Sequence, residues 1–251
     1  MLKNGISATG TRIYIATADK GILVSENDGR SWSSFNKGLP EKFIPVKIYQ
    51  NNDILYLTTF SSGLFRVIEK NGKWENISSP DFKRRSIYSK EPRYRKISAF
   101  AVDQENSSNI SAATKHTIYR STDGGTTWKS ISMNGLNKLY YITALSLSGN
   151  KIYAGTSFKS IYESSGEKFK LTGTGLPEEA YSDTVKFTEQ CASLYIDKTD
   201  LYAGFYFGGG VYARKNNSKK FNALYSNKNK DLNSVIYDIR IHKNRIFFSD
   251  G

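Results

Sequence analysis

The sequence is poor in the residues that build metal centres and disulfide frameworks. Its 251 residues include one cysteine, Cys191, and two histidines, His116 and His242. A single cysteine excludes an intrachain disulfide, and these three side chains are too few for a structural zinc site. We therefore expect no bound metal and no cofactor. The cysteine content leaves the redox compartment undetermined.

Long hydrophobic runs are also absent. No stretch reaches the roughly 18 consecutive apolar residues of a membrane-spanning helix, so we predict no membrane span. The first residues, MLKNGISATG, lack the apolar segment of a signal peptide. Because a leader removed from the chain would leave the same beginning, the cellular compartment stays unknown at this point.

What the chain does have is aromatic residues, glycine and positive charge. It contains 17 tyrosines, 14 phenylalanines and 20 glycines against 5 prolines, which favours short strands joined by turns over a helical bundle. The 36 lysines and arginines outnumber the 23 aspartates and glutamates, giving a net charge of +13. Such a charge favours acidic partners through long-range attraction. Nucleic acid is a disfavoured partner, because no RRM, KH or zinc-finger signature occurs.

Two turns of similar sequence reveal an internal repeat. Residues 121–128 read STDGGTTW and residues 25–32 read SENDGRSW. Each turn lies in a unit of four short runs with alternating apolar residues. The aromatic residue that closes the turn recurs at Trp32, Trp74, Trp128, Phe169 and Phe221. Repeats of about 40–45 residues with four strands each are typical of propeller blades.

The turn at 121–128 resembles the Asp-box, or BNR repeat, S-x-D-x-G-x-T-W. Every defined position is matched, by Ser121, Asp123, Gly125, Thr127 and Trp128. In the turn at 25–32, Ser25, Gly29 and Trp32 match and Asn27 replaces the acid. The chain is thus similar to BNR-type propellers, which include Ycf48-like photosystem II assembly factors, sortilin-like (Vps10) proteins, sialidases and xyloglucanases. This resemblance alone favours a secreted or periplasmic location.

We therefore predict an all-β fold, a β-propeller of four-stranded antiparallel blades in a single domain spanning 1–251. Five blades are complete, and a sixth contributes its first two strands. The expected blades are about 4–43, 44–95, 96–139, 140–190, 191–233 and the partial 234–251. Their expected innermost strands are Gly5–Thr9, Val46–Tyr49, Ile97–Val102, Ile142–Leu147, Cys191–Ile196 and Val235–Ile241. We expect a fragment of a longer protein, with self-association through the open sheet edge as the alternative.

The turn residues have a structural explanation that needs no ligand. Glycine supplies the positive φ of a tight turn, and Asp and Ser side chains hydrogen-bond to main-chain groups that the turn leaves unpaired. Trp128 is expected to cover its turn and to pack between adjacent sheets. We interpret the motif as a marker of the fold and not as an active site.

Two insertions of about ten residues, within 78–97 and 177–190, point to one face of the propeller. Both lie in the connection from the outer strand of one blade to the inner strand of the next. This connection shares a face with the turn between the second and third strands, and the Asp-box turns lie on the opposite face. Because loops on a rigid scaffold often carry function, we predict that the ligand binds at the loop-bearing face.

The first insertion, SSPDFKRRSIYSKEPRYRKI, has a net charge of +5. Arginine forks and tyrosine faces suit carboxylate, phosphate or anionic sugar groups. The alternative is a solvated basic loop without a ligand. The candidate ligand-binding residues are Arg84, Arg85, Tyr88, Arg93, Tyr94 and Arg95, together with Tyr206 from the segment FYFGGGVY. The expected partner is an acidic protein surface or an anionic glycan, and the expected function is a non-catalytic binding or assembly scaffold.

The second insertion, PEEAYSDTVKFTEQ, has a net charge of −3 and holds the clustered acids Glu178, Glu179 and Asp183. They support an alternative, a sialidase-like or xyloglucanase-like glycoside hydrolase or its inactive remnant. Glycoside hydrolysis needs a defined pair of carboxylates or, in sialidases, a tyrosine nucleophile with partners. No such set is evident, so we assign no catalytic residue and leave enzyme activity open. His116 and His242 are expected in exposed turns.

Overall fold

The computed structural model describes residues 5–9, 11–84, 93–136, 139–158, 161–164, 166, 168–180, 186–188, 190–206, 209–215, 218–225, 235–242 and 245–250. The chain forms two compact units, Met1–Ile97 with Thr122–Trp128, and Ser98–Ser121 with Lys129–Gly251. Within the described residues, no helix combines the length and apolar character that crossing a membrane requires.

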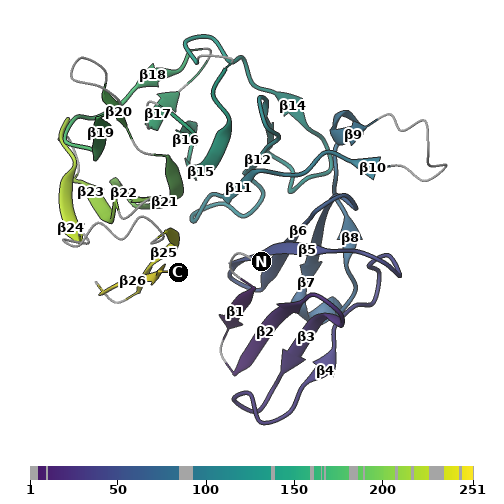
Figure 1. Cartoon of the computed structure of the whole chain (residues 1–251). Coiled ribbons are helices and arrows are strands. Elements are labelled where there is room, and N and C mark those ends of the chain that lie inside the picture. The colour runs from purple at the N-terminus through teal and green to yellow at the C-terminus, as the bar shows by residue number, and fades with distance from the viewer. Residues whose placement is uncertain are drawn as a thin grey trace. The chain divides into compact units, whose positions relative to one another are not determined.

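The first unit contains two four-stranded antiparallel sheets whose strands follow one another in chain order (Figure 1). The first sheet consists of β1 (Ile6–Thr9), β2 (Arg12–Thr17), β3 (Gly21–Ser25) and β4 (Ser33–Ser34). The second consists of β5 (Pro45–Asn51), β6 (Ile54–Thr59), β7 (Leu64–Ile68) and β8 (Glu75–Asn76). Two short 3-10 helices, η1 (Glu69–Asn71) and η2 (Pro80–Phe82), and a hairpin of β9 (Lys83–Arg84) and β10 (Arg93–Tyr94) complete it.

The second unit repeats the same four-stranded plan (Figure 1). Its sheets are β11 (Ala99–Val102), β12 (Ile110–Ala113), β13 (Ile118–Ser121) and β14 (Lys129–Ser130); β15 (Ile142–Ser148), β16 (Lys151–Thr156), β17 (Ile161–Ser164) and β18 (Lys170–Leu171); and β21 (Cys191–Asp197), β22 (Asp200–Phe205), β23 (Val211–Arg214) and β24 (Asn222–Tyr225). Two hairpins, β19 (Glu178–Ala180) with β20 (Lys186–Thr188) and β25 (Ile236–His242) with β26 (Arg245–Asp250), pair as isolated two-stranded sheets.

This order confirms the predicted fold class, an all-β propeller of four-stranded antiparallel blades with the first two strands of a sixth. The expected innermost strands correspond to β1, β5, β11, β15, β21 and β25. Two local expectations were wrong. His242 is the last residue of β25, opposite Arg245, because the ladder continues to the end of that strand. Both insertions contain a two-stranded hairpin where the sequence suggested loops.

The burial pattern explains why these runs form stacked sheets. In β6, β16 and β22 every residue after the first is buried. Since successive side chains point to opposite faces of a strand, these strands have apolar neighbours on both faces. In β2 the pattern alternates, with Tyr14 and Ala16 buried and their neighbours partly exposed. β2 is therefore covered mainly on one face, as expected of a half-buried strand.

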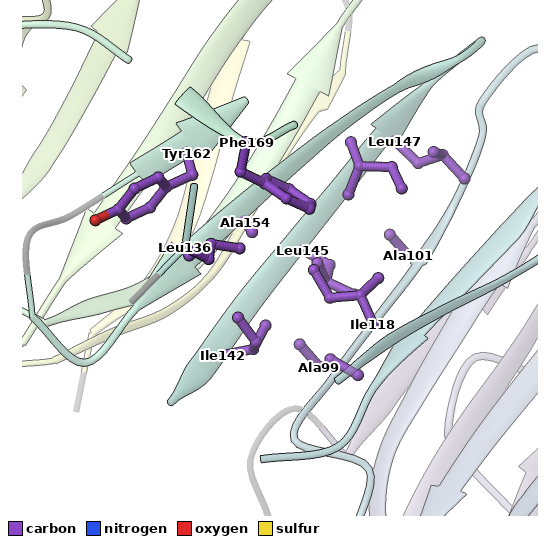
Figure 2. Close-up of a cluster of buried hydrophobic side chains, with 12 residues drawn as sticks. Ala99, Ala101, Ile118, Leu136, Ile142, Leu145, Leu147, Ala154, Tyr162 and Phe169 are labelled. Atoms are coloured by element: carbon purple, nitrogen blue, oxygen red, sulfur yellow. The ribbon is translucent and has the colours of Figure 1, made fainter. Parts of the chain in front are cut away.

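Each core lies between two consecutive sheets. In the second unit, Ala99, Ala101 and Ile118 of one sheet pack against Ile142, Leu145 and Leu147 of the next, as Figure 2 shows. In the first unit, Tyr14, Ile22 and Val24 pack against residues of the second sheet that include Leu57 and Trp74. Burial of this apolar surface is the main stabilising contribution, at roughly 25 cal/mol per Å².

The two turns singled out in the sequence are held together by their own side chains. In the turn at 121–128, the Asp123 carboxylate accepts hydrogen bonds from Thr127 N at 2.9 Å and from Thr127 Oγ1 at 2.6 Å. In the turn at 25–32, Ser25 Oγ accepts from Gly29 N at 2.8 Å and Asn27 Oδ1 accepts from Ser31 N at 2.9 Å. These contacts agree with the predicted turn chemistry, in which each polar side chain bonds within the turn.

The closing tryptophans differ in environment. Trp128 Nε1 donates to Ile77 O at 2.8 Å and its ring packs edge-on against Phe82 at 5.3 Å, which ties the turn to the second sheet. Trp74 is buried, and its Nε1 donates to Phe35 O at 2.7 Å in the first sheet's connection. Trp32 is 38% exposed and bonds within its own turn, to Gly29 O at 3.1 Å. Thus Trp74 and Trp128 join segments of adjacent repeats, whereas Trp32 only closes its turn.

A repeated Gly-Leu turn fastens consecutive sheets. The main-chain N–H groups of Trp74, Phe169 and Phe221 donate to the carbonyls of Lys37, Asn134 and Thr174 at 2.8, 2.7 and 2.8 Å. Each acceptor precedes a glycine with positive φ, namely Gly38, Gly135 and Gly175. A Cβ on any of these glycines would overlap the carbonyl oxygen of the same aromatic residue. The close approach of two main chains therefore requires glycine.

A second fastening lies at the turns between first and second strands, in the second unit. The buried Asp103 carboxylate accepts from Asn109 Nδ2 at 2.8 Å and from Gly149 N at 2.7 Å. Arg120 adds bonds to Asn109 Oδ1 at 2.9 Å and Gly149 O at 2.7 Å. Since Gly149 belongs to the next sheet's turn, this network joins the β11–β14 sheet to the β15–β18 sheet.

Candidate functional site

The antiparallel order places two classes of segment at one end of each sheet. These are the turn between the second and third strands and the connection that leaves the fourth strand. We call this the loop-bearing end. Both insertions lie there, because each follows a fourth strand, β8 or β18. The turns at 25–32 and 121–128 join the third and fourth strands and lie at the opposite end.

The basic insertion is organised around a short ladder. Arg84 lies opposite Arg93 and Lys83 lies opposite Tyr94. Opposed residues of an antiparallel pair have Cα atoms only about 4.5–5.5 Å apart. The register therefore brings two of the predicted arginine positions together, with a lysine next to one of them.

The base of this hairpin is fixed to the first unit. Phe82 is fully buried, and Arg95 N donates to Phe82 O at 2.7 Å. Arg95 is exposed, and Lys96 Nζ lies 5.9 Å from the ring centroid of Phe60. Two of the predicted binding residues, Arg85 and Tyr88, lie outside the described residues. The described part of the insertion is thus a basic hairpin on an apolar anchor.

The acidic insertion forms the β19–β20 hairpin. Glu178 lies opposite Thr188 and Glu179 lies opposite Phe187. Asp183 lies outside the described residues. The register places two adjacent glutamate positions on one strand, whereas the basic hairpin places its two arginines on opposite strands.

Tyr206 lies at the loop-bearing end of the β21–β24 sheet. Its ring is partly exposed and packs edge-on against Tyr237 of β25, with centroids 6.5 Å apart. Its N–H donates to Gln190 O at 3.0 Å. Tyr206 therefore contacts the following hairpin and also presents some of its surface to solvent.

Sequence reasoning missed a group of aromatic residues at the loop-bearing end of the second unit. Lys115 Nζ lies 3.7 Å from the ring centroid of Tyr141, and the His116 ring packs edge-on against Tyr141 at 5.0 Å. Tyr140 packs against Phe158 at 6.0 Å. We call these five residues the aromatic cluster. The signal in the sequence is the strings TKHT (114–117), LYY (139–141) and SF (157–158), each at the loop-bearing end of its sheet.

No set of three or more His, Cys, Asp or Glu residues could hold a metal ion within the part of the chain that the structure describes. Burial raises the pKa of the Cys191 thiol, which therefore has little thiolate character. His116 is exposed, as predicted from its turn.

Comparison with known proteins supports the architecture. No family model and no curated protein sequence matches the chain. Among solved structures, YCF48 bound to D1 peptide aligns with a TM-score of 0.63 and 12% identity, over 98% of this chain and 74% of that one. YCF48 from Cyanidioschyzon merolae aligns with a TM-score of 0.61 and 13% identity, over 97% and 78%.

A glycoside hydrolase propeller is also similar. The GH74 xyloglucanase from Xanthomonas campestris aligns with a TM-score of 0.51 and 18% identity, over 88% of this chain. The chain spans only 42% of that enzyme's length. At such identities these likenesses establish the fold alone, which is a β-propeller.

Proposed function

We propose that this chain is a non-catalytic binding or assembly scaffold that recognises an acidic protein segment through its loop-bearing end. The observation that carries the proposal is the β9–β10 register, which opposes Arg84 and Arg93 on a hairpin anchored by the buried Phe82. Concentrated positive charge suits carboxylates, and arginine binds them in a bidentate manner.

Two further facts support an acidic protein as the partner. The net charge of +13 favours attraction of acidic molecules from a distance. One structurally similar protein, YCF48, was solved with a bound D1 peptide. The turn motifs at 25–32 and 121–128, which resemble Asp-boxes, serve only to hold the outer strands together in this proposal.

The proposal is tested by charge reversal with a matched control. In the test variant Arg84, Arg85, Arg93 and Arg95 are replaced by Glu. In the control variant the exposed Arg30, Lys73, Lys129 and Lys170, near the opposite ends of their sheets, are replaced by Glu, which changes the net charge equally. Binding of a fluorescein-labelled oligoglutamate peptide is measured by anisotropy at low and moderate salt.

We expect the test variant to lose binding, with an unchanged unfolding temperature, and the control variant to retain most of it. Wild-type affinity should fall as salt increases, because exposed charges are screened. Equal losses in both variants would mean that only net charge matters, and the proposed site would be rejected. Binding of heparin in place of the peptide would redirect the proposal to an anionic glycan.

A glycoside hydrolase is the second candidate. It is favoured by the adjacent Glu178 and Glu179 of β19 and by the structural likeness to GH74 propellers. The test is hydrolysis of xyloglucan oligosaccharides and a panel of aryl glycosides by the wild type and by Glu178→Gln and Glu179→Gln variants. Turnover that these variants abolish would favour the enzyme, and a silent panel would reject it.

Edge-mediated self-association is the third candidate. In the described part of the chain β26 pairs only with β25, and its residue Phe247 is 53% exposed. Unpaired strand edges invite pairing with another chain. Light scattering at high concentration should then report multimers that Phe247→Lys disperses, and a monomeric wild type would rule this assembly out.

A further inference from the structure

The aromatic cluster is held in place by main-chain hydrogen bonds from three separate segments. Ile142 N donates to Lys115 O at 3.0 Å, which joins the turn after β12 to the start of β15. Tyr141 N donates to Ser157 Oγ at 3.1 Å, and Ser157 N donates to Tyr141 O at 2.9 Å. Because these bonds fix the backbone on both sides of the rings, a ligand would pay little conformational entropy to order them.

Three large apolar side chains are exposed on two segments that hydrogen bonds join. Tyr141 is 41% exposed, Phe158 49% and Leu139 78%. Leu139 and Tyr141 are two residues apart, and Tyr141 N donates to the side chain of Ser157, the residue before Phe158. Single exposed apolar residues are ordinary on protein surfaces. Neighbouring ones rimmed by polar groups are typical of sites that bind another molecule.

The ring geometry favours a peptide side chain over a sugar. The His116 and Tyr141 rings are inclined by 74°, and the Tyr140 and Phe158 rings by 55°. Rings tilted in this way do not offer the flat and open aromatic face on which a pyranose ring stacks, whereas an apolar side chain can contact them from their edges. The face of Tyr141 is in addition approached by Lys115 Nζ at 3.7 Å.

The charge at the cluster indicates what should flank that side chain. Lys115 is exposed, and its ammonium group lies over the ring of Tyr141. The ammonium group carries three N–H donors, so a carboxylate of the ligand can approach it from solvent. The positive net charge of the chain acts in the same direction.

We propose that the aromatic cluster is an anchor site for a peptide segment with a large apolar side chain next to an Asp or Glu. The apolar side chain packs on Tyr141 and Phe158, and the carboxylate pairs with Lys115. The inference rests on the proposed binding function and adds a sequence preference to it, because the basic hairpin alone would select charge without regard to apolar residues.

The test is selection from a random peptide library displayed on phage, carried out on the whole chain. Three proteins are compared: the wild type, a Tyr141→Ala/Phe158→Ala variant, and a Leu224→Ala variant that removes an exposed apolar residue outside the cluster. Selected peptides are synthesised, and their affinities are measured by fluorescence anisotropy. Near-ultraviolet circular dichroism and urea unfolding check that each variant is folded, and Lys115→Gln provides a second, milder variant.

The expected result is enrichment of peptides with a large apolar residue beside Asp or Glu. Their affinity should fall about tenfold or more in the Tyr141→Ala/Phe158→Ala variant and should be retained in the Leu224→Ala variant, since central aromatic contacts carry much of the energy of an interface. Lys115→Gln should lower the affinity for these peptides more than it lowers the affinity for matched peptides in which Asp or Glu is replaced by Asn or Gln.

Other results separate the two proposals. One such result is enrichment of acidic peptides without any enriched apolar residue, whose binding is lost only when the arginines of the basic hairpin are replaced by Glu. It would overturn this inference and leave the proposed function standing. No enrichment on the wild type would overturn both. Cellohexaose that perturbs the amide resonances of Tyr141 and Phe158, in the absence of peptide enrichment, would assign the cluster to a sugar instead.

Discussion

The Gly-Leu turn between consecutive sheets leads to a prediction with an internal control. Gly135 has a φ of +87°, and a Cβ at this position would overlap the carbonyl oxygen of Phe169. Gly149 also has a positive φ, +53°, but no atom lies within 4 Å of the place that its Cβ would occupy. Replacing each by alanine therefore separates the cost of main-chain approach from the cost of the left-handed conformation.

The expected magnitudes follow from the contacts. The left-handed conformation costs a non-glycine residue roughly 1–2 kcal/mol, and both variants should lose this amount. Gly135→Ala must also push away the backbone of Phe169, just before β18, and it disrupts the bond from Phe169 N to Asn134 O, 2.7 Å in length. A lost main-chain hydrogen bond costs about 1 kcal/mol, and disturbed packing of the buried Phe169 adds a comparable amount. We expect Gly135→Ala to be less stable than Gly149→Ala by about 2 kcal/mol.

Urea unfolding followed by far-ultraviolet circular dichroism measures this difference. The midpoint of Gly135→Ala should be lower than that of Gly149→Ala at an unchanged dependence on urea, as expected when stability alone changes. Equal midpoints would show that moving the main chain at Gly135 away from the main chain at Phe169 does not lower stability. The Gly-Leu turn would then not be the fastening that the hydrogen bonds indicate.

Further predictions concern three buried groups. Asp103→Ala should lower the free energy of unfolding by about 2–3 kcal/mol, because it leaves Gly149 N without its acceptor and removes one of the two acceptors of Asn109 Nδ2; thermal unfolding that matches the wild type would refute the role of this network. Cys191 should react with a thiol reagent only after denaturation, because it is fully buried and burial raises its pKa; fast labelling of the folded protein would contradict that. Burial raises the pKa of Tyr56 to about 12, above the unfolded value of about 10. The unfolding free energy should therefore be insensitive to this group below about pH 10 and should fall as the pH rises from about 10 through 12. Tyr56→Phe should remove that part of the alkaline decline, and an identical decline in the variant would rule out Tyr56 as its source.

The fold was predictable because its determinants are local and repeated. Alternating apolar runs, turns with glycine, and an aromatic residue that recurs in each unit define four strands per unit. The burial of both faces of β6, β16 and β22 follows from the same runs. The Gly-Leu turns occur in the sequence as KGLP, NGL and TGLP. Their role depends on hydrogen bonds from the main chain of the next repeat, and the sequence alone does not show that this segment lies beside the turn.

The site was less predictable, because it depends on how separate loops meet. Charge density identified the insertion at 78–97, but not the register that opposes Arg84 and Arg93. The aromatic cluster combines residues near 115, 140 and 158, and no single stretch among them is distinctive. Hydrogen bonds such as that from Ile142 N to Lys115 O determine which loops are neighbours, and a sequence pattern does not contain that information.

The Gly-Leu fastening has a consequence for how such chains can vary over time. Its donors and acceptors are main-chain atoms, so its direct requirement is glycine at Gly38, Gly135 and Gly175. Phe169 and Phe221 accordingly occupy the place that Trp74 has in the second sheet, and all three are buried. Because consecutive sheets are joined by main-chain hydrogen bonds, the surface side chains of one repeat can change while its contacts with the neighbouring repeats are kept. The loops of one blade can therefore change in length and sequence without compensating changes in the other blades.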